Sequence, residues 1–188
     1  ADTLAALRYC TGKAKKIVSL TNVSESSISR ESDCSLPILA GIEIGVASTK
    51  AFTCQLSVLF ALAIKASSDL EKISNEEQMN IYSEAIKIPS LINQILSKKD
   101  SFSAIATKLS EARDVLFLGR GLLYPLALEG ALKLKEISYI HAEAYASGEL
   151  KHGPIALIDK SVPVIILTPK DKLFDKNISN IQEVAARG

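Results

Sequence analysis

Residues 115–121 have the sequence Val-Leu-Phe-Leu-Gly-Arg-Gly, a short apolar run that ends in two closely spaced glycines. Consecutive large apolar residues predict a strand buried on both faces, and the glycines predict a tight turn after it. A helix is expected to follow over about 124–140. A buried strand, a turn and a helix in this order are the unit from which parallel α/β sheets are built.

The same alternation extends outward on both sides of this unit. We expect strands over 17–21, 35–39, 142–146 and 162–168, and helices over 2–9, 48–64, 75–96, 102–111 and 173–186. The serine-rich segment 22–29 is expected to form a turn. Pro37 indicates an edge strand or a strand end, and Pro89 is expected to break or kink its helix. The sequence therefore predicts an α/β fold with parallel strands, organised as two domains, 1–100 and 101–188.

The amino-acid composition argues against several classes of protein. The 22 basic and 21 acidic residues nearly cancel, so the net charge gives no argument for binding nucleic acid or an anionic membrane. The longest apolar stretch, near 56–64, is shorter than a membrane span and is followed by Lys65. The three cysteines are widely spaced and odd in number, which favours a reducing cytoplasm over a disulfide framework. No signal peptide is recognised, and the start at Ala1 suggests a piece of a longer protein.

Two helix starts are candidate ligand sites. Residues 41–48 form a loop with two glycines, and Ser48 or Thr49 can cap the helix that follows. Hydroxyl and N–H groups there suit a sugar hydroxyl or a phosphate as well as they suit simple capping. Gly119 and Gly121 invite a dinucleotide interpretation, but Tyr124 stands where that motif needs its third glycine.

Helix 124–140 carries the most informative charges. Glu129, Lys133 and Glu136 are spaced i, i+4 and i+7, so they share one helical face. The simple interpretation is a pair of surface salt bridges. The chemical one is a lysine that attacks a carbonyl beside a glutamate that moves a proton. Gly130 on the same helix would allow close backbone approach.

The two histidines differ in context. His152 lies in the glycine-flanked segment 148–154 and is a candidate acid–base group, although a single loop histidine is more often inert. His141 ends the apolar helix and is expected to be a hydrogen-bonded structural residue. With Glu143 and Glu149 the histidines have the right types for zinc, but the spacing matches no common ligand pattern, so no metal and no cofactor is expected.

Taken together, these segments resemble the glutamine–fructose-6-phosphate aminotransferase family, also called the glucosamine-6-phosphate synthases. The resemblance runs from end to end and is interrupted mainly over 69–110. The stretches that carry it are 1–8, 43–52, 118–121, 127–146 and 148–154.

The resemblance implies two partial SIS (sugar isomerase) domains, each a flavodoxin-like three-layer α/β/α arrangement with a parallel sheet flanked by helices. It implies that Lys133 forms a Schiff base with opened fructose 6-phosphate and that Glu136 moves a proton between C1 and C2. His152 would open the sugar ring, supplied by the neighbouring subunit of a homodimer. Val46, Ala47 and Ser48 would contact the sugar hydroxyls. The expected product is glucosamine 6-phosphate, made in the cytoplasm.

Several parts of that family have no counterpart in this sequence. These are the phosphate-binding loop and two strands that precede residue 1, the C-terminal tail, and the glutaminase domain that supplies ammonia. Their absence argues against activity of the isolated stretch. Two alternatives stay open. One is a non-catalytic phosphosugar-binding SIS module, which does not need the Lys133–Glu136 pair. The other is a relative that uses another amino sugar or removes ammonia from one.

Overall fold

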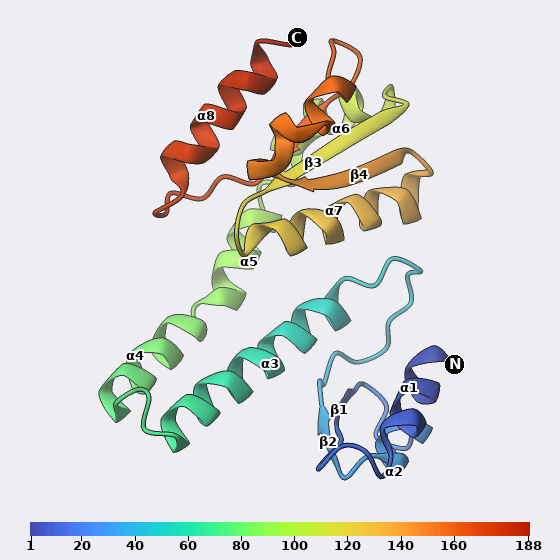
Figure 1. Ribbon diagram of the computed structural model, residues 1–188, viewed down its shortest axis with the longest axis vertical. Coiled ribbons are helices and arrows are strands. Elements are labelled where there is room, and N and C mark those ends of the chain that lie inside the picture. Colours follow the sequence, from blue (N-terminus) through green and yellow to red (C-terminus); the bar gives the residue numbers. More distant parts are fainter. The chain divides into compact units, whose positions relative to one another are not determined.

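The computed structural model describes all 188 residues, in two compact units, 1–92 and 93–188 (Figure 1). Helix α5, Ile88–Leu96, contains the boundary between the units. Each unit is a body of its own and contains its own parallel sheet. The predicted α/β class with parallel strands is therefore confirmed in both.

The second unit is built on a three-stranded sheet in the order β4-β3-β5. Its central strand β3, Asp114–Gly119, pairs in parallel with β4, His141–Ala146, and with β5, Val164–Ile166. Residues 115–118 are all buried, as the unbroken apolar run predicted. The helices of this unit are α6, Ser103–Ser110, α7, Leu123–Ser138, and α8, Phe174–Ala185.

The sheet of the second unit separates two apolar clusters, which makes three layers (Figure 1). On one face, Val115 and Phe117 pack with Ala127 and Ala131 of α7. On the other face, Leu116 and Leu118 pack with Leu150, Ile158 and side chains that include Val184 of α8. The side chains of β3 alternate between the two layers because successive residues of a strand point to opposite faces.

Two glycines allow α7 to lie close to β3. A Cβ on Gly130 would meet the Phe117 ring at 3.0 Å, which confirms the close approach expected at that position. A Cβ on Gly119 would lie 2.2 Å from the Leu123 carbonyl oxygen. Only a residue without a side chain lets the strand turn so tightly into its helix.

The first unit has a smaller sheet. Strands β1, Val18–Thr21, and β2, Cys34–Pro37, pair in parallel, and Pro37 ends its strand as expected. Around them lie α1, Asp2–Cys10, and α2, Ser27–Glu31, a short helix where the serine-rich sequence predicted only a turn. Ser26 explains the helix because its hydroxyl accepts a hydrogen bond from the Ser29 N–H.

The first unit also contains helices α3, Lys50–Asp69, and α4, Asn75–Ala85. The helix expected over 75–96, with a break or kink at Pro89, is two helices, and the break lies at residues 86–87, just before the proline. Pro89 sits in the first turn of α5, where the missing N–H of proline costs no intrahelical hydrogen bond. The predicted break is therefore present, and the proline lies at the start of the second helix rather than at the break itself.

Helix α3 is the one helix whose length and composition alone would suffice to cross a membrane. None of its residues is buried within the chain, although its sequence is strongly apolar. A single helix of this kind is weak evidence for a membrane, because the core helix of a soluble protein passes the same test.

Candidate functional site

The candidate catalytic group is a charged cluster on α7. The Lys133 ammonium lies 2.6 Å from a Glu136 carboxylate oxygen and 3.4 Å from a Glu129 carboxylate oxygen. The helical spacing predicted this juxtaposition, and the structure brings the three side chains together. Lys133 therefore has a carboxylate beside it in each direction along the helix.

The cluster differs from the ordinary surface ion pairs of the chain. The side chain of Lys133 is 21% exposed, whereas that of Lys65, paired with Asp69, is 63% exposed. Water screens a half-buried pair less than an exposed one. The hydrogen bond to Glu136 raises the pKa of Lys133 above its ordinary value, and the Glu129 carboxylate adds to this effect. The resting lysine is thus an ammonium, and Glu136 is the nearest group able to take its proton.

The face of α7 that carries the cluster points away from its own sheet. Ala127 and Ala131, which pack on the sheet, lie about half a turn away from Glu129 and Lys133 around the helix. On the cluster's side of α7, Leu126 and Leu132 are each 41% exposed. The sheet of this unit therefore does not cover the cluster. A site shielded from water there would need a further protein surface packed against this face of α7.

His152 belongs to the layer on the other face of the sheet from α7, in the second unit. It ends the short 3₁₀ helix η2, Ser147–His152, and its side chain is exposed. No hydrogen bond or ion pair joins it to Lys133 or Glu136. Gly153 follows with φ +145°, a conformation that L side chains rarely adopt. Leu150, fully buried against Leu116 and Leu118, fixes the helix to the sheet.

The loop with Val46, Ala47 and Ser48 belongs to the first unit. Val46 is 90% exposed, and Ala47 and Ser48 are half-buried. Neither predicted cap works as expected, because Thr49 occupies the N-cap position without a side-chain capping bond. Glu43 takes this role: its carboxylate accepts the Ala51 N–H at 3.0 Å and the Ser48 hydroxyl at 3.5 Å. A carboxylate is a favourable partner for the positive end of a helix dipole.

His141 is hydrogen-bonded, as predicted. Its Nδ1 lies 2.9 Å from an Asp114 carboxylate oxygen on the neighbouring strand, and its Nε2 lies 3.5 Å from Glu143. Glu143 also accepts a hydrogen bond from the Tyr145 hydroxyl, which raises the pKa of that tyrosine. No group of three or more histidine, cysteine or acidic side chains is placed to hold a metal ion.

Sequence reasoning missed a polar network that holds η2 against α8. Lys151 pairs with Glu183 at 2.8 Å, and Asn180 hydrogen-bonds both Glu183 and Arg120. Hydrogen bonding from Lys151 lowers the pKa of Glu183 below its ordinary value. Arg120 and Asn180 are 60 positions apart along the chain, so no local pattern could have grouped them.

Comparison with known proteins gives the same end-to-end match that the motifs suggested. The SIS domain family matches residues 1–65 and 108–188. The chain is 58% identical over its whole length to the glutamine–fructose-6-phosphate aminotransferase of Rhizobium meliloti, and 57% identical to that of Brucella abortus. It spans 31% of the length of each of these curated relatives.

Solved structures agree with the sequence comparison. The C-terminal domain of glucosamine-fructose-6-phosphate aminotransferase from Francisella tularensis superposes with a TM-score of 0.97 at 46% identity, covering 100% of this chain and 53% of that one. A putative phosphosugar isomerase from Clostridium difficile gives a TM-score of 0.80 at 27% identity, covering 94% of this chain and 51% of that one. The predicted SIS-type fold is confirmed.

Proposed function

The chain belongs to the SIS domain family, and we propose that it is part of the sugar-isomerising region of a glutamine–fructose-6-phosphate aminotransferase. The observation that carries this proposal is the half-buried Lys133 held at 2.6 Å by Glu136. A module that only binds a phosphosugar has no need of a lysine with a carboxylate at hydrogen-bond distance. The end-to-end identity with the relatives from Rhizobium meliloti and Brucella abortus supports the same conclusion.

In the proposed reaction, the Lys133 amine attacks C2 of ring-opened fructose 6-phosphate once Glu136 has taken its proton. Water leaves and an imine forms. Ammonia then replaces the lysine nitrogen on C2. Moving a proton from C1 to C2, and the proton of the C1 hydroxyl to the imine nitrogen, leaves an amine on C2 and an aldehyde at C1, which is glucosamine 6-phosphate. Glu136 is the base proposed for this transfer because one positioned carboxylate serves both adjacent carbons.

The other expected site residues complete this proposal. Val46, Ala47 and Ser48 contact the sugar hydroxyls, and the Glu43 carboxylate holds their loop at the start of α3. His152 opens the ring from a second subunit. A partner subunit would also explain why the cluster on α7 faces away from its own sheet. Ammonia comes from a glutaminase domain of the longer protein, which works in the cytoplasm.

Borohydride trapping tests the imine directly. The protein is incubated with fructose 6-phosphate, reduced with borohydride, and analysed by intact mass and peptide mapping. We expect one stable adduct on Lys133, absent from Lys133→Arg and retained in Lys135→Arg, a lysine two residues away on the same helix. Binding of fructose 6-phosphate to the full-length protein without any adduct would favour the phosphosugar-binding module instead.

A complementation experiment tests the shared site. Full-length His152→Asn and Lys133→Ala variants are each inactive on this proposal. Mixing them, with exchange of subunits, produces mixed dimers in which one of the two sites has both an intact Lys133 and an intact His152. We expect up to about half of the wild-type rate per mixed dimer. Mixtures that stay inactive although subunits exchange would contradict the shared site.

A further inference from the structure

A second site is suggested by the carboxyl edge of the sheet in the second unit. The chain leaves β3 into α7, which covers one face of the sheet, and leaves β5 toward α8, which packs on the other face. The two connections therefore diverge between neighbouring strands. In open parallel sheets this divergence opens a crevice at the carboxyl ends of the strands, where ligands commonly bind.

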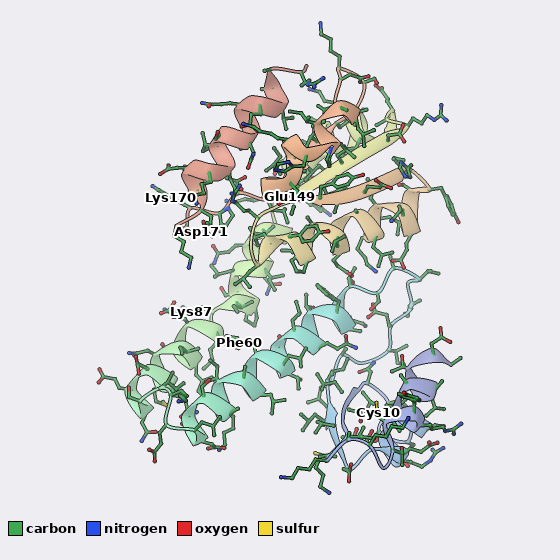
Figure 2. All side chains as sticks on the ribbon, in the orientation of Figure 1. Cys10, Phe60, Lys87, Glu149, Lys170 and Asp171 are labelled. Carbon is green, nitrogen blue, oxygen red and sulfur yellow. The ribbon has the colours of Figure 1, made fainter.

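A pocket of about 240 Å³ lies at this edge. Arg120, which directly follows β3, lines it together with residues of η2 and α8. The full lining is Arg120, Gly148, Lys151, Lys176, Ser179, Asn180 and Glu183. Figure 2 shows the side chains of this region, with Glu149 labelled on η2 and Lys170 labelled ahead of α8.

The pocket has an excess of positive charge. Three of its lining residues are basic and one is acidic. Glu183 is already paired with Lys151 at 2.8 Å. Arg120 donates to the neutral side-chain oxygen of Asn180 at 3.1 Å, and Lys176 has no ion-pair partner. Two positive charges therefore face the pocket without a neutralising carboxylate, which favours an anionic ligand.

The arginine is held in place before any ligand arrives. Asn180 is 7% exposed and uses its oxygen for Arg120 and its nitrogen for Glu183. Gly148 presents bare backbone to the guanidinium, since a Cβ there would lie 3.5 Å from its Nη2. Arg120 has five N–H donors, of which the Asn180 contact uses one. A preorganised planar fork with free donors matches the geometry of a phosphate group.

We propose that this pocket binds the phosphate group of a small metabolite, at a site separate from the Lys133 cluster. Arg120 and Lys176 contact the phosphate oxygens, and Ser179, whose hydroxyl donates to Glu183 at 3.5 Å, lines the same pocket. The sheet lies between the pocket's α8 residues and α7, which carries Lys133. The site does not depend on imine formation. A volume of about 240 Å³ suits a phosphate with a small sugar better than a nucleotide.

Calorimetric titration of the full-length protein with inorganic phosphate tests the proposal. Lys176→Gln and Arg120→Gln each remove one positive charge from the pocket, and Lys170→Gln removes one from an exposed position outside it. We expect at least a tenfold loss of one phosphate-binding event in both pocket variants and none in Lys170→Gln. Lys176 is exposed, so its variant is expected to fold even if Arg120→Gln does not.

A third pocket variant should strengthen phosphate binding instead of weakening it. Glu183→Gln removes the pocket's one carboxylate and frees Lys151, so it should tighten phosphate binding several-fold. Repeating the titrations with fructose 6-phosphate distinguishes a sugar phosphate from free phosphate as the occupant. Phosphate binding that is absent, or equal in Lys176→Gln and Lys170→Gln, would overturn the proposal whatever the trapping experiment at Lys133 shows.

Discussion

Replacing Gly119 with alanine should disrupt the second unit severely, although it adds only one methyl group. The added Cβ would lie 2.2 Å from the Leu123 carbonyl oxygen, 2.5 Å from its carbonyl carbon and 2.8 Å from the Tyr124 nitrogen. Favourable contacts between such atoms need about 3.5 Å, so the first turn of α7 would have to move by about 1 Å. These atoms are backbone, and no side-chain rotation relieves the clash.

The cost follows from that displacement. Overpacking in a tight site costs about 1–3 kcal/mol when side chains can adjust, so we expect about 3 kcal/mol or more here. The movement also displaces the helix that carries Lys133, and misplacement by about 1 Å can reduce a rate about 100-fold. Urea unfolding followed by circular dichroism measures the first effect, and borohydride trapping at Lys133 measures the second.

Gly148→Ala is the matched control, because it adds the same methyl group in the same unit. Its Cβ would lie 3.5 Å from Arg120 Nη2, an ordinary contact, so the free energy of unfolding should change by about 0.5 kcal/mol or less. If the free energies of unfolding of Gly119→Ala and Gly148→Ala differ by less than about 1 kcal/mol, the steric argument for the turn is wrong.

Three further changes test other parts of the structure. Glu136→Gln removes the largest cause of the raised Lys133 pKa, so that pKa should fall in an NMR titration of the free protein; an unchanged Lys133 pKa would contradict the assigned pair. Leu150→Ala should lower the free energy of unfolding in urea by about 2–5 kcal/mol, because the Leu150 side chain is fully buried. Leu122 is 94% exposed, so Leu122→Ala should lower it by about 0.5 kcal/mol or less in the same titration. Ser74→Ala removes the capping box with Glu77 at the start of α4, so thermal unfolding should show a stability loss of about 1 kcal/mol. If Ser83→Ala, a change within α4, lowers stability as much, the stabilising role of the capping box is refuted.

Local sequence patterns were enough for most of the secondary structure. The apolar run 115–118 and its following glycines predicted β3 and the turn into α7, because burial and backbone freedom are properties of those residues themselves. The 3.6-residue period likewise predicted that Glu129, Lys133 and Glu136 share one helical face, and the ion pairs of Lys133 confirm it.

The errors arose where a residue has two compatible environments. Pro89 predicted a break or kink at its own position, yet the break lies at residues 86–87 because the fixed φ of proline fits the first turn of α5. Thr49 and Ser48 predicted a cap, yet Glu43 from the preceding loop supplies it. The serine-rich segment before residue 30 predicted a turn, yet Ser26 caps the short helix α2. Propensity alone could not choose between these options.

The sequence by itself determined the α/β class, the order of strands and helices, and the charged face of α7, because each depends on neighbours within one or two helical turns or along one strand. Only the tertiary structure decided the rest. The exposure of Lys133 and its lack of an ion pair or hydrogen bond with His152 could be read only from the folded chain, and the pocket around Arg120 brings together residues dozens of positions apart. Parallel strands need long crossover connections, so their carboxyl ends collect side chains from distant segments that no local pattern can bring together.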